Sequence, residues 1–365
     1  MELDSKYVDA ADDPAVYVLT EKGVYMENSY QPSETWITVE PEKQGMDQEL
    51  PARLRSVISS EYSNITGIAV VRNGYIVCEE YFHGGGPQKP VHVASVTKSI
   101  LSALIGIALE EGYLTSVHQR VLDFFPEYRP SRPNRIRESI TLEHLLTMTA
   151  PYAFEDWKEP LNQLCTSPDW VTFALDQLGE QGEPGVFKYS TAGAHLLSAV
   201  LSEATGRNAR EFANEFLFSR TGMREIPAVP MAGYGYEDLF GKGVTGWAHD
   251  PHGITTGGWG LTLTVRDMAR FGLLYLNHGI WNGKQVIPER WIAASTKPNA
   301  NHYGYLWWLF EEPGVTAFAA MGDGGNIICC IPGKDLVVAI ASEFTADPKD
   351  RWTLIKDHII PAAAV

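Results

Sequence analysis

The sequence is poor in cysteine and in basic residues. Its four cysteines, at positions 78, 165, 329 and 330, form neither a metal-ligand spacing nor a disulfide framework. The 29 Lys and Arg residues stand against 45 Asp and Glu, which gives a net charge of −16. A surface of that sign repels nucleic acids and anionic membranes, so neither is an expected partner.

Long apolar runs and targeting signals are missing as well. No uninterrupted apolar stretch reaches membrane-spanning length. Residues 1–5 carry neither a basic nor an apolar signal region, which together with the unpaired cysteines favours a cytoplasmic protein. What is present, 44% hydrophobic and 20% charged residues in a chain of 365, is typical of a globular protein with a large core.

Strand patterns lie towards both ends of the chain and helical patterns in the middle. Two β-rich runs, 66–71 and 75–79, meet at Asn73-Gly74 and predict a hairpin; further strands are expected over 303–309, 316–321, 326–331 and 336–342. Helices are expected over 48–62, 95–109, 141–147, 170–178, 192–204, 209–217, 265–277 and 288–294. The first forty-odd residues fit short strands or an extended arm.

These elements predict an α+β fold, in which one antiparallel sheet from N- and C-terminal strands is flanked by helices and joined by a mostly helical insertion. We expect an N-terminal extension over 1–47, a sheet domain over 48–111 and 226–365, and the helical insertion over 112–225. A cleft between sheet and insertion is the expected place for a pocket.

The segment 94–99, with Ser95 and Lys98, opens an apolar run over 100–109. In a helix, Ser95 lies in the first turn beside free backbone N–H groups, and Lys98 lies one turn on, on the same face. In a low-dielectric site such a lysine can lose its proton and make the serine hydroxyl nucleophilic. The alternative is a capped helix with a surface lysine, but a helix that is apolar on nearly every face is buried, so Lys98 needs a polar partner.

Two later segments could serve the same chemistry. Tyr189 follows Lys188 just before a predicted helix, and a phenol beside a lysine ammonium can shuttle a proton. The glycine-rich turn 322–326 precedes a strand, where backbone N–H groups can donate to an oxyanion. The alternatives are a core tyrosine with a satisfied hydroxyl and an ordinary hairpin turn.

Taken together, these segments resemble the serine β-lactamase and penicillin-binding protein family. The resemblance is to the branch with class C β-lactamases, DD-peptidases, carboxylesterases and aminohexanoate-oligomer hydrolases. It runs from about residue 65 to the C-terminus and is carried by segments 94–99, 140–149, 187–193, 257–260, 266–271, 303–308 and 322–326. It implies a β-lactamase/transpeptidase-like fold and acyl-enzyme chemistry without a cofactor.

The resemblance also implies roles for single residues. Ser95 looks like the acylated nucleophile and Lys98 like its proton acceptor. Tyr189 resembles the tyrosine that relays the proton to the leaving group and then activates water. The backbone N–H groups of Ser95 and Asn326 would form the oxyanion hole.

The chain departs from the family pattern at two positions. Thr191 stands where β-lactamases and DD-peptidases usually carry an asparagine that contacts the substrate amide; a small hydroxyl residue is typical of the esterase and amide-hydrolase members. Asp323 stands where a Lys or His usually contacts a substrate carboxylate. An aspartate there either favours a neutral or cationic substrate or only stabilises the turn, and both interpretations stay open.

The remaining expected substrate-binding residues are Gly324, Gly325, Trp259 and Tyr152. Tyr152 belongs to a segment, with Glu155, Asp156 and Trp157, at a place that commonly rims the cleft in this family.

A metal site is not expected. His249 and His252 flank Asp250 and Pro251, but no third ligand is apparent.

The sequence therefore predicts a cofactor-independent serine hydrolase that acts on a small ester or amide. One alternative is β-lactamase or DD-peptidase activity, against which Asp323, Thr191 and the missing leader argue. The other is a non-catalytic acyl-binding or interaction protein, against which the intact Ser95, Lys98 and Tyr189 argue.

Overall fold

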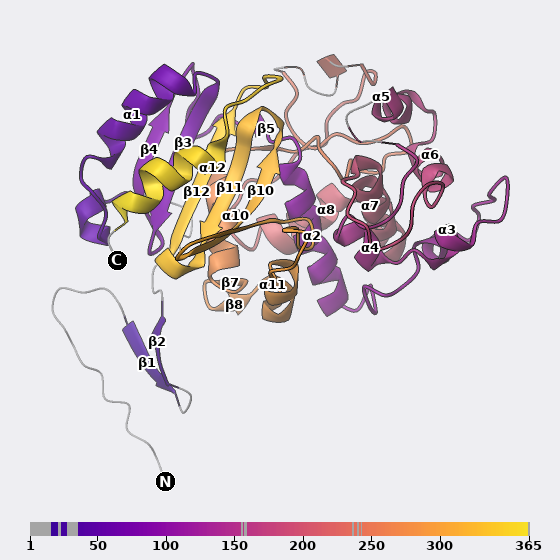
Figure 1. Cartoon of the computed structure of the whole chain (residues 1–365), viewed down its shortest axis with the longest axis horizontal. Coiled ribbons are helices and arrows are strands. Elements are labelled where there is room, and N and C mark those ends of the chain that lie inside the picture. The colour runs from indigo at the N-terminus through magenta and orange to yellow at the C-terminus, as the bar shows by residue number, and fades with distance from the viewer. Residues whose placement is uncertain are drawn as a thin grey trace, which may run out of the picture.

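A computed structural model describes residues 16–20, 23–27, 36–154, 156, 159–235, 237–238, 241 and 243–363. Its centre is a six-stranded antiparallel sheet in the order β4-β3-β12-β11-β10-β9 (Figure 1). The strands are β3 (Ile65–Arg72), β4 (Tyr75–Tyr81), β9 (Trp308–Glu312), β10 (Val315–Gly322), β11 (Asn326–Ile331) and β12 (Leu336–Ser342). The sheet thus joins both ends of the chain through β3 and β12, which confirms the predicted α+β class.

Three two-stranded pairs complete the strands of the described ranges. They are β1 (Val16–Thr20) with β2 (Gly23–Glu27), β5 (Val91–His92) with β6 (Thr262–Leu263), and β7 (Ile280–Trp281) with β8 (Lys284–Gln285). The first pair falls in the N-terminal extension, where short strands were expected.

Helices lie in the segments between and after these strands. They are α1 (Leu50–Glu61), α2 (Val96–Glu110), α3 (Arg135–Ser139), α4 (Leu142–Leu146), α5 (Glu159–Thr166), α6 (Trp170–Gln177), α7 (Thr191–Thr205), α8 (Ala209–Ala213), α10 (Val265–Leu276), α11 (Glu289–Ser295) and α12 (Arg351–Leu354). Short 3₁₀ turns include η4 (Asp323–Gly325), and π turns continue α8 and α12. In the part of the chain that the structure describes, no helix is long and apolar enough to cross a bilayer.

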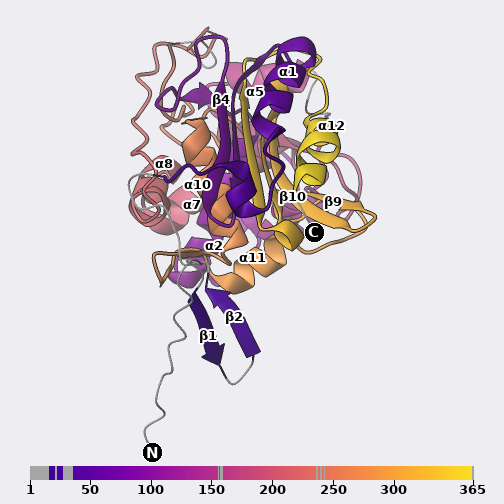
Figure 2. The same cartoon turned by 90° about the vertical axis from the view of Figure 1, so that its left-hand side faces the viewer.

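The sheet is covered by helices on both faces because its central strands are apolar on both sides. Along β12, positions 336, 338 and 340 pack in one core cluster and positions 337, 339 and 341 in the other, as the period of two in a strand requires. Figures 1 and 2 show α1 and α12 on one face, and α2 and α10 on the other. Helices α3 to α8 gather beyond α2 (Figure 1).

The prediction of a strand over 303–309 is wrong before Trp308. Leu306 has a left-handed φ of 62°, and its N–H donates to Leu146 O at 2.9 Å. Gly304 lies so close to Ser295 that a Cβ would stand 2.0 Å from the Ser295 carbonyl oxygen. The aromatic residues of this segment fill the core as a turn, which their strand-like composition does not reveal.

The helix α2 is enclosed on all sides, since each residue over 96–108 is buried. Gly106 allows α11 to approach it: a Cβ on Gly106 would lie 2.3 Å from Cγ of Trp291. The helix is therefore fixed by side chains that fit against its backbone, and it holds Ser95 and Lys98 at its N-terminal end.

We expect Gly106→Ala to destabilise the protein, although alanine favours a helix more than glycine does. The added methyl group displaces Trp291, and such overpacking costs about 1–3 kcal/mol, against roughly 1 kcal/mol gained in helix propensity. The measurement is the free energy of unfolding in urea. Gly86→Ala is the control, because no atom lies within 4 Å of a Cβ there; equal unfolding midpoints for the two variants would contradict the prediction.

Candidate active site

Ser95 lies at the N-terminal end of α2, behind a strained backbone position. Ala94 has a φ of 49°, in the left-handed region that L-residues rarely occupy. Ser95 is the N-cap residue, yet its side chain makes no capping hydrogen bond. The hydroxyl is therefore left for other partners, which disfavours the interpretation of Ser95 as an ordinary helix cap.

The end of β10 reaches the backbone of Ser95 through a glycine. A Cβ on Gly322 would lie 2.3 Å from Val93 O and 3.0 Å from Ser95 N. Only a residue without a side chain permits this approach. Nothing in the sequence distinguishes Gly322 from the other glycines of the 322–326 turn as the residue that contacts Ser95.

Lys98 is buried, with 1% of its surface exposed, and its Nζ faces three oxygen atoms. Nζ lies 3.0 Å from Ser95 Oγ, 3.0 Å from Thr191 Oγ1 and 2.9 Å from Gly258 O. These contacts supply the polar partners that a buried lysine requires. The structure therefore rules out a surface lysine and places the amine against the serine hydroxyl.

Tyr189 precedes α7, and its ring covers the lysine. The ring centroid is 4.7 Å from Lys98 Nζ, within the range of a cation–π contact. The ring stacks on Trp308 at 5.8 Å and meets the edge of Tyr303 at 6.1 Å. Burial raises the pKa of Tyr303 well above its usual value, with smaller contributions from Tyr189 and Asp156, so Tyr303 is a neutral support.

Thr191, the first residue of α7, connects Lys98 to a buried carboxylate. Its N–H donates to Asp156 Oδ1, and its hydroxyl donates to Asp156 Oδ2 at 2.6 Å. Asp156 is 3% exposed. From the sequence, Asp156 is expected only on the rim of the cleft; its neighbours Glu155 and Trp157 lie outside the described residues.

The loop that carries Gly258 is pressed onto α7. A Cβ on Gly257 would lie 2.0 Å from Ala194 O, and a Cβ on Gly258 would lie 2.6 Å from Thr191 Cγ2. Both positions therefore require glycine, and their closeness brings the Gly258 carbonyl to the lysine.

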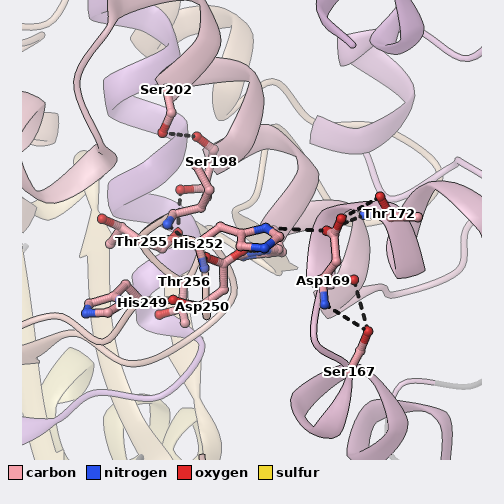
Figure 3. A network of polar contacts seen from close by, with 12 residues as sticks. Ser167, Asp169, Thr172, Ser198, Ser202, His249, Asp250, His252, Thr255 and Thr256 are labelled. Atoms are coloured by element: carbon pink, nitrogen blue, oxygen red, sulfur yellow. Dashed lines mark hydrogen bonds and ion pairs between the residues drawn. The ribbon is translucent and has the colours of Figure 1, made fainter. Parts of the chain in front are cut away.

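A network of polar contacts anchors the same loop (Figure 3). Asp250 is fully buried; its Oδ2 lies 3.2 Å from His195 Nε2, while Oδ1 accepts the N–H of Ile254 at 2.9 Å. Ser198 Oγ on α7 donates to Thr255 O at 2.6 Å, as Figure 3 shows. Burial tends to raise the pKa of Asp250, but the hydrogen bond and charge of His195 and two backbone N–H groups lower it overall.

His249 and His252, which flank Asp250 and Pro251, each contact an oxygen atom of another residue. His249 Nδ1 lies 2.7 Å from Asp250 O, and His252 Nδ1 lies 3.9 Å from Asp169 Oδ1 (Figure 3). Within the described ranges, no group of three or more His, Cys, Asp or Glu side chains could hold a metal ion.

The turn after β10 is held in place by buried polar side chains. Arg351 of α12 donates from Nε to Gly325 O at 3.2 Å and from Nη2 to Gly324 O at 3.3 Å. Burial lowers the pKa of Arg351 to about 10, so the side chain remains a cation at neutral pH. Asn326 Nδ2 donates to Asp323 O at 2.8 Å, and Oδ1 accepts the N–H of Ser342 at 3.0 Å.

Asp323 shares its surroundings with the charges of the site. Burial raises the pKa of its carboxyl group; Asp156 raises it further, while the positive charge of Lys98 lowers it. A carboxyl group therefore does lie near Lys98, at the position where the resemblance leads one to expect a cation.

A pocket of about 540 Å³ opens beside Tyr189. It is lined by Pro151, Asp156, Gln181, Gly182, Glu183, Val186, Phe187, Lys188 and Tyr189. Its size is in the range of small-molecule sites.

None of the six predicted substrate-binding residues is among those that line this pocket. Tyr152 is 1% exposed and packs against Phe154 at 5.8 Å, so its side chain lies in the core and not on the rim. Trp259 is 7% exposed and packs against Trp170 at 5.7 Å. Both support neighbouring segments by packing.

Comparison with known proteins gives a consistent result. The family model described as "Beta-lactamase" matches residues 60–358. The 6-aminohexanoate-dimer hydrolase of Paenarthrobacter ureafaciens is 23% identical over 321 residues, covering 80% of this chain and 76% of the relative.

Solved structures share the fold. EstCE1, a hydrolase with promiscuous acyltransferase activity, matches with a TM-score of 0.67 and 17% identity, covering 86% of this chain and 98% of the other. A class C beta-lactamase from Rhodobacter sphaeroides matches with a TM-score of 0.63 and 18% identity, covering 87% and 100%. The sequence-based expectation of family and fold is confirmed: the chain belongs to the beta-lactamase family, whose members are serine hydrolases.

Proposed function

We propose that this protein cleaves a small ester or amide through an acyl-enzyme on Ser95. The observation that carries the proposal is the buried amine of Lys98, 3.0 Å from Ser95 Oγ. A lysine amine in this position can accept the serine proton at the moment of attack.

In the first half of the reaction, Ser95 Oγ bonds to the substrate carbonyl carbon while its proton passes to Lys98 Nζ. The C=O electron pair moves to oxygen and forms the oxyanion. When the pair returns, the bond to the leaving group breaks, and Tyr189 relays the proton from Lys98 to that group. In the second half, water attacks the acyl carbon and passes a proton to Tyr189, while Tyr189 passes its own proton to Lys98. The bond between the acyl carbon and Ser95 Oγ then breaks, and Ser95 Oγ takes the proton from Lys98.

Two backbone N–H groups would stabilise the oxyanion. One is that of Ser95, beside the N-terminal end of α2. For the second, the contact between Gly322 and Ser95 N favours the N–H of Asp323, the next residue in the chain. Asn326 was the residue predicted from the sequence; its N–H stays the alternative, while its side chain holds the turn.

The charges around the cleft favour a neutral or cationic substrate. Asp156 and Glu183 line the pocket, and Asp323 lies near Lys98. The basic lining residue, Lys188, donates from Nζ to Tyr152 O at 2.9 Å. An amide substrate that carries a positively charged amino group fits the negative charge of these residues. The similarity to a relative named 6-aminohexanoate-dimer hydrolase supports this substrate class. A β-lactam or peptide carboxylate would be repelled.

The first test is Ser95→Ala. We expect a fluorophosphonate probe to label the native protein and not the variant, and turnover of a p-nitrophenyl ester to fall by about 10³-fold or more, since the nucleophile is lost. Ser60→Ala, on the exposed side of α1, is the matched control. Labelling that persists in Ser95→Ala would refute the nucleophile assignment, and labelling of the native protein without turnover would favour the non-catalytic alternative.

The second test concerns Asp323 and pH. Its pKa is raised, so the carboxylate forms only as the pH rises through values above the usual figure of about 4. The preference for a neutral p-nitrophenyl ester over the carboxylate-bearing nitrocefin, measured as a ratio of kcat/KM, should therefore grow with pH over that range. The ratio should be flat in Asp323→Asn, and Asp323→Lys should improve relative handling of nitrocefin by about tenfold. The same ratio in all three proteins would show that Asp323 only stabilises the turn.

A further inference from the structure

The hydrogen bonds around Lys98 have a direction that can be worked out by counting protons. The hydroxyl of Thr191 has one proton, which it donates to Asp156 Oδ2 at 2.6 Å. Thr191 Oγ1 can then only accept from Lys98 Nζ, 3.0 Å away. The Gly258 carbonyl, at 2.9 Å from Nζ, is also an acceptor only.

These two acceptors determine where the lone pair of the lysine points. In the deprotonated form that the proposed mechanism requires, the amine of Lys98 has two protons and one lone pair. If both protons go to Thr191 and Gly258, the lone pair is left for the third contact, Ser95 Oγ at 3.0 Å. This is the arrangement in which Lys98 can take the serine proton.

We propose that Asp156 is a positioning residue that fixes the Thr191 hydroxyl as an acceptor and thereby turns the lone pair of Lys98 towards Ser95. This inference rests on the proposed function, in which Ser95 is the nucleophile. Asp156 acts through Thr191 and is not required to touch the substrate.

The contact between Asp156 Oδ1 and the backbone N–H of Thr191 determines how an asparagine side chain would be oriented at position 156. Asp156 Oδ1 accepts the backbone N–H of Thr191, so in Asp156→Asn the amide oxygen must occupy that place. The amide nitrogen then faces Thr191 Oγ1 and donates to it. The threonine proton is released towards Lys98, where it competes with Ser95 for the lone pair.

The experiment is a double-mutant cycle with Asp156→Asn, Thr191→Val and the two combined. The measured quantities are kcat and KM for a p-nitrophenyl ester and the rate of fluorophosphonate labelling. We expect Asp156→Asn to lower kcat and the labelling rate by about tenfold or more, with KM nearly unchanged. Thr191→Val should cost less, because it removes one acceptor but leaves no proton to compete.

The decisive comparison is Asp156→Asn in the Thr191→Val background. Valine has no hydroxyl, so the hydrogen bond between residues 156 and 191 cannot change direction. Asp156→Asn should therefore change the rate in this background by no more than about twofold. Thr191→Ser keeps the hydroxyl, so in this background Asp156→Asn should lower the rate by the same factor as in the native protein. If Thr191→Val removes the rate loss caused by Asp156→Asn, misfolding of the Asp156→Asn variant cannot explain that loss. The thermal unfolding of each variant checks that it is folded.

The outcomes separate the inference from the proposed function. Equal losses from Asp156→Asn in both backgrounds, or a loss confined to KM, would overturn the role of Asp156, because it would then act by its charge or on the substrate. If the native protein showed no Ser95-dependent labelling, the proposed function would fail and this inference with it.

Discussion

The burial of one lysine amine is the constraint on which the rest of this structure depends. A charged or strongly polar nitrogen inside a protein costs several kcal/mol unless hydrogen bonds replace its water. Lys98 obtains them from three separate segments: the turn before α2, the first residue of α7, and the loop at Gly258. Each segment must reach the same point to within a few tenths of an ångström. The glycines at 257 and 258 and the polar contacts of Asp250 position the loop of Gly258, and the ring of Tyr189 covers the amine.

The sheet contributes to the site through the end of one strand. Gly322 brings β10 against the backbone of Ser95, and the turn that follows is held by Arg351 from the last helix of the fold. The C-terminal helix α12, packed on the far face of the sheet, thus supports the turn that follows the contact between Gly322 and Ser95. The face of the sheet that carries α1 and α12 is therefore part of the support of the site.

The sequence revealed the parts of this arrangement that are local in the chain. The hairpin at Asn73-Gly74 has the two positive φ angles, 51° and 83°, that this dipeptide favours. The apolar run after Ser95 likewise predicted a buried helix. Contacts across the chain left no such signal: Asp156, Gly258 and Arg351 act through partners 35, 160 and 26 residues away. Residues 303–307 form a turn where the sequence predicts a strand, because aromatic residues suit both a strand and a core.

The distances along the chain between Lys98 and its partners also bear on how the protein folds. Thr191 lies 93 residues from Lys98, and Gly258 lies 160 residues from it. Two long loops must therefore close before the amine acquires its ligands, and closing them carries an entropic cost that only later contacts repay. Until that point Lys98 lacks the contacts that hold its amine against Ser95. Under the proposed mechanism, a nascent or partly unfolded molecule is therefore chemically inert.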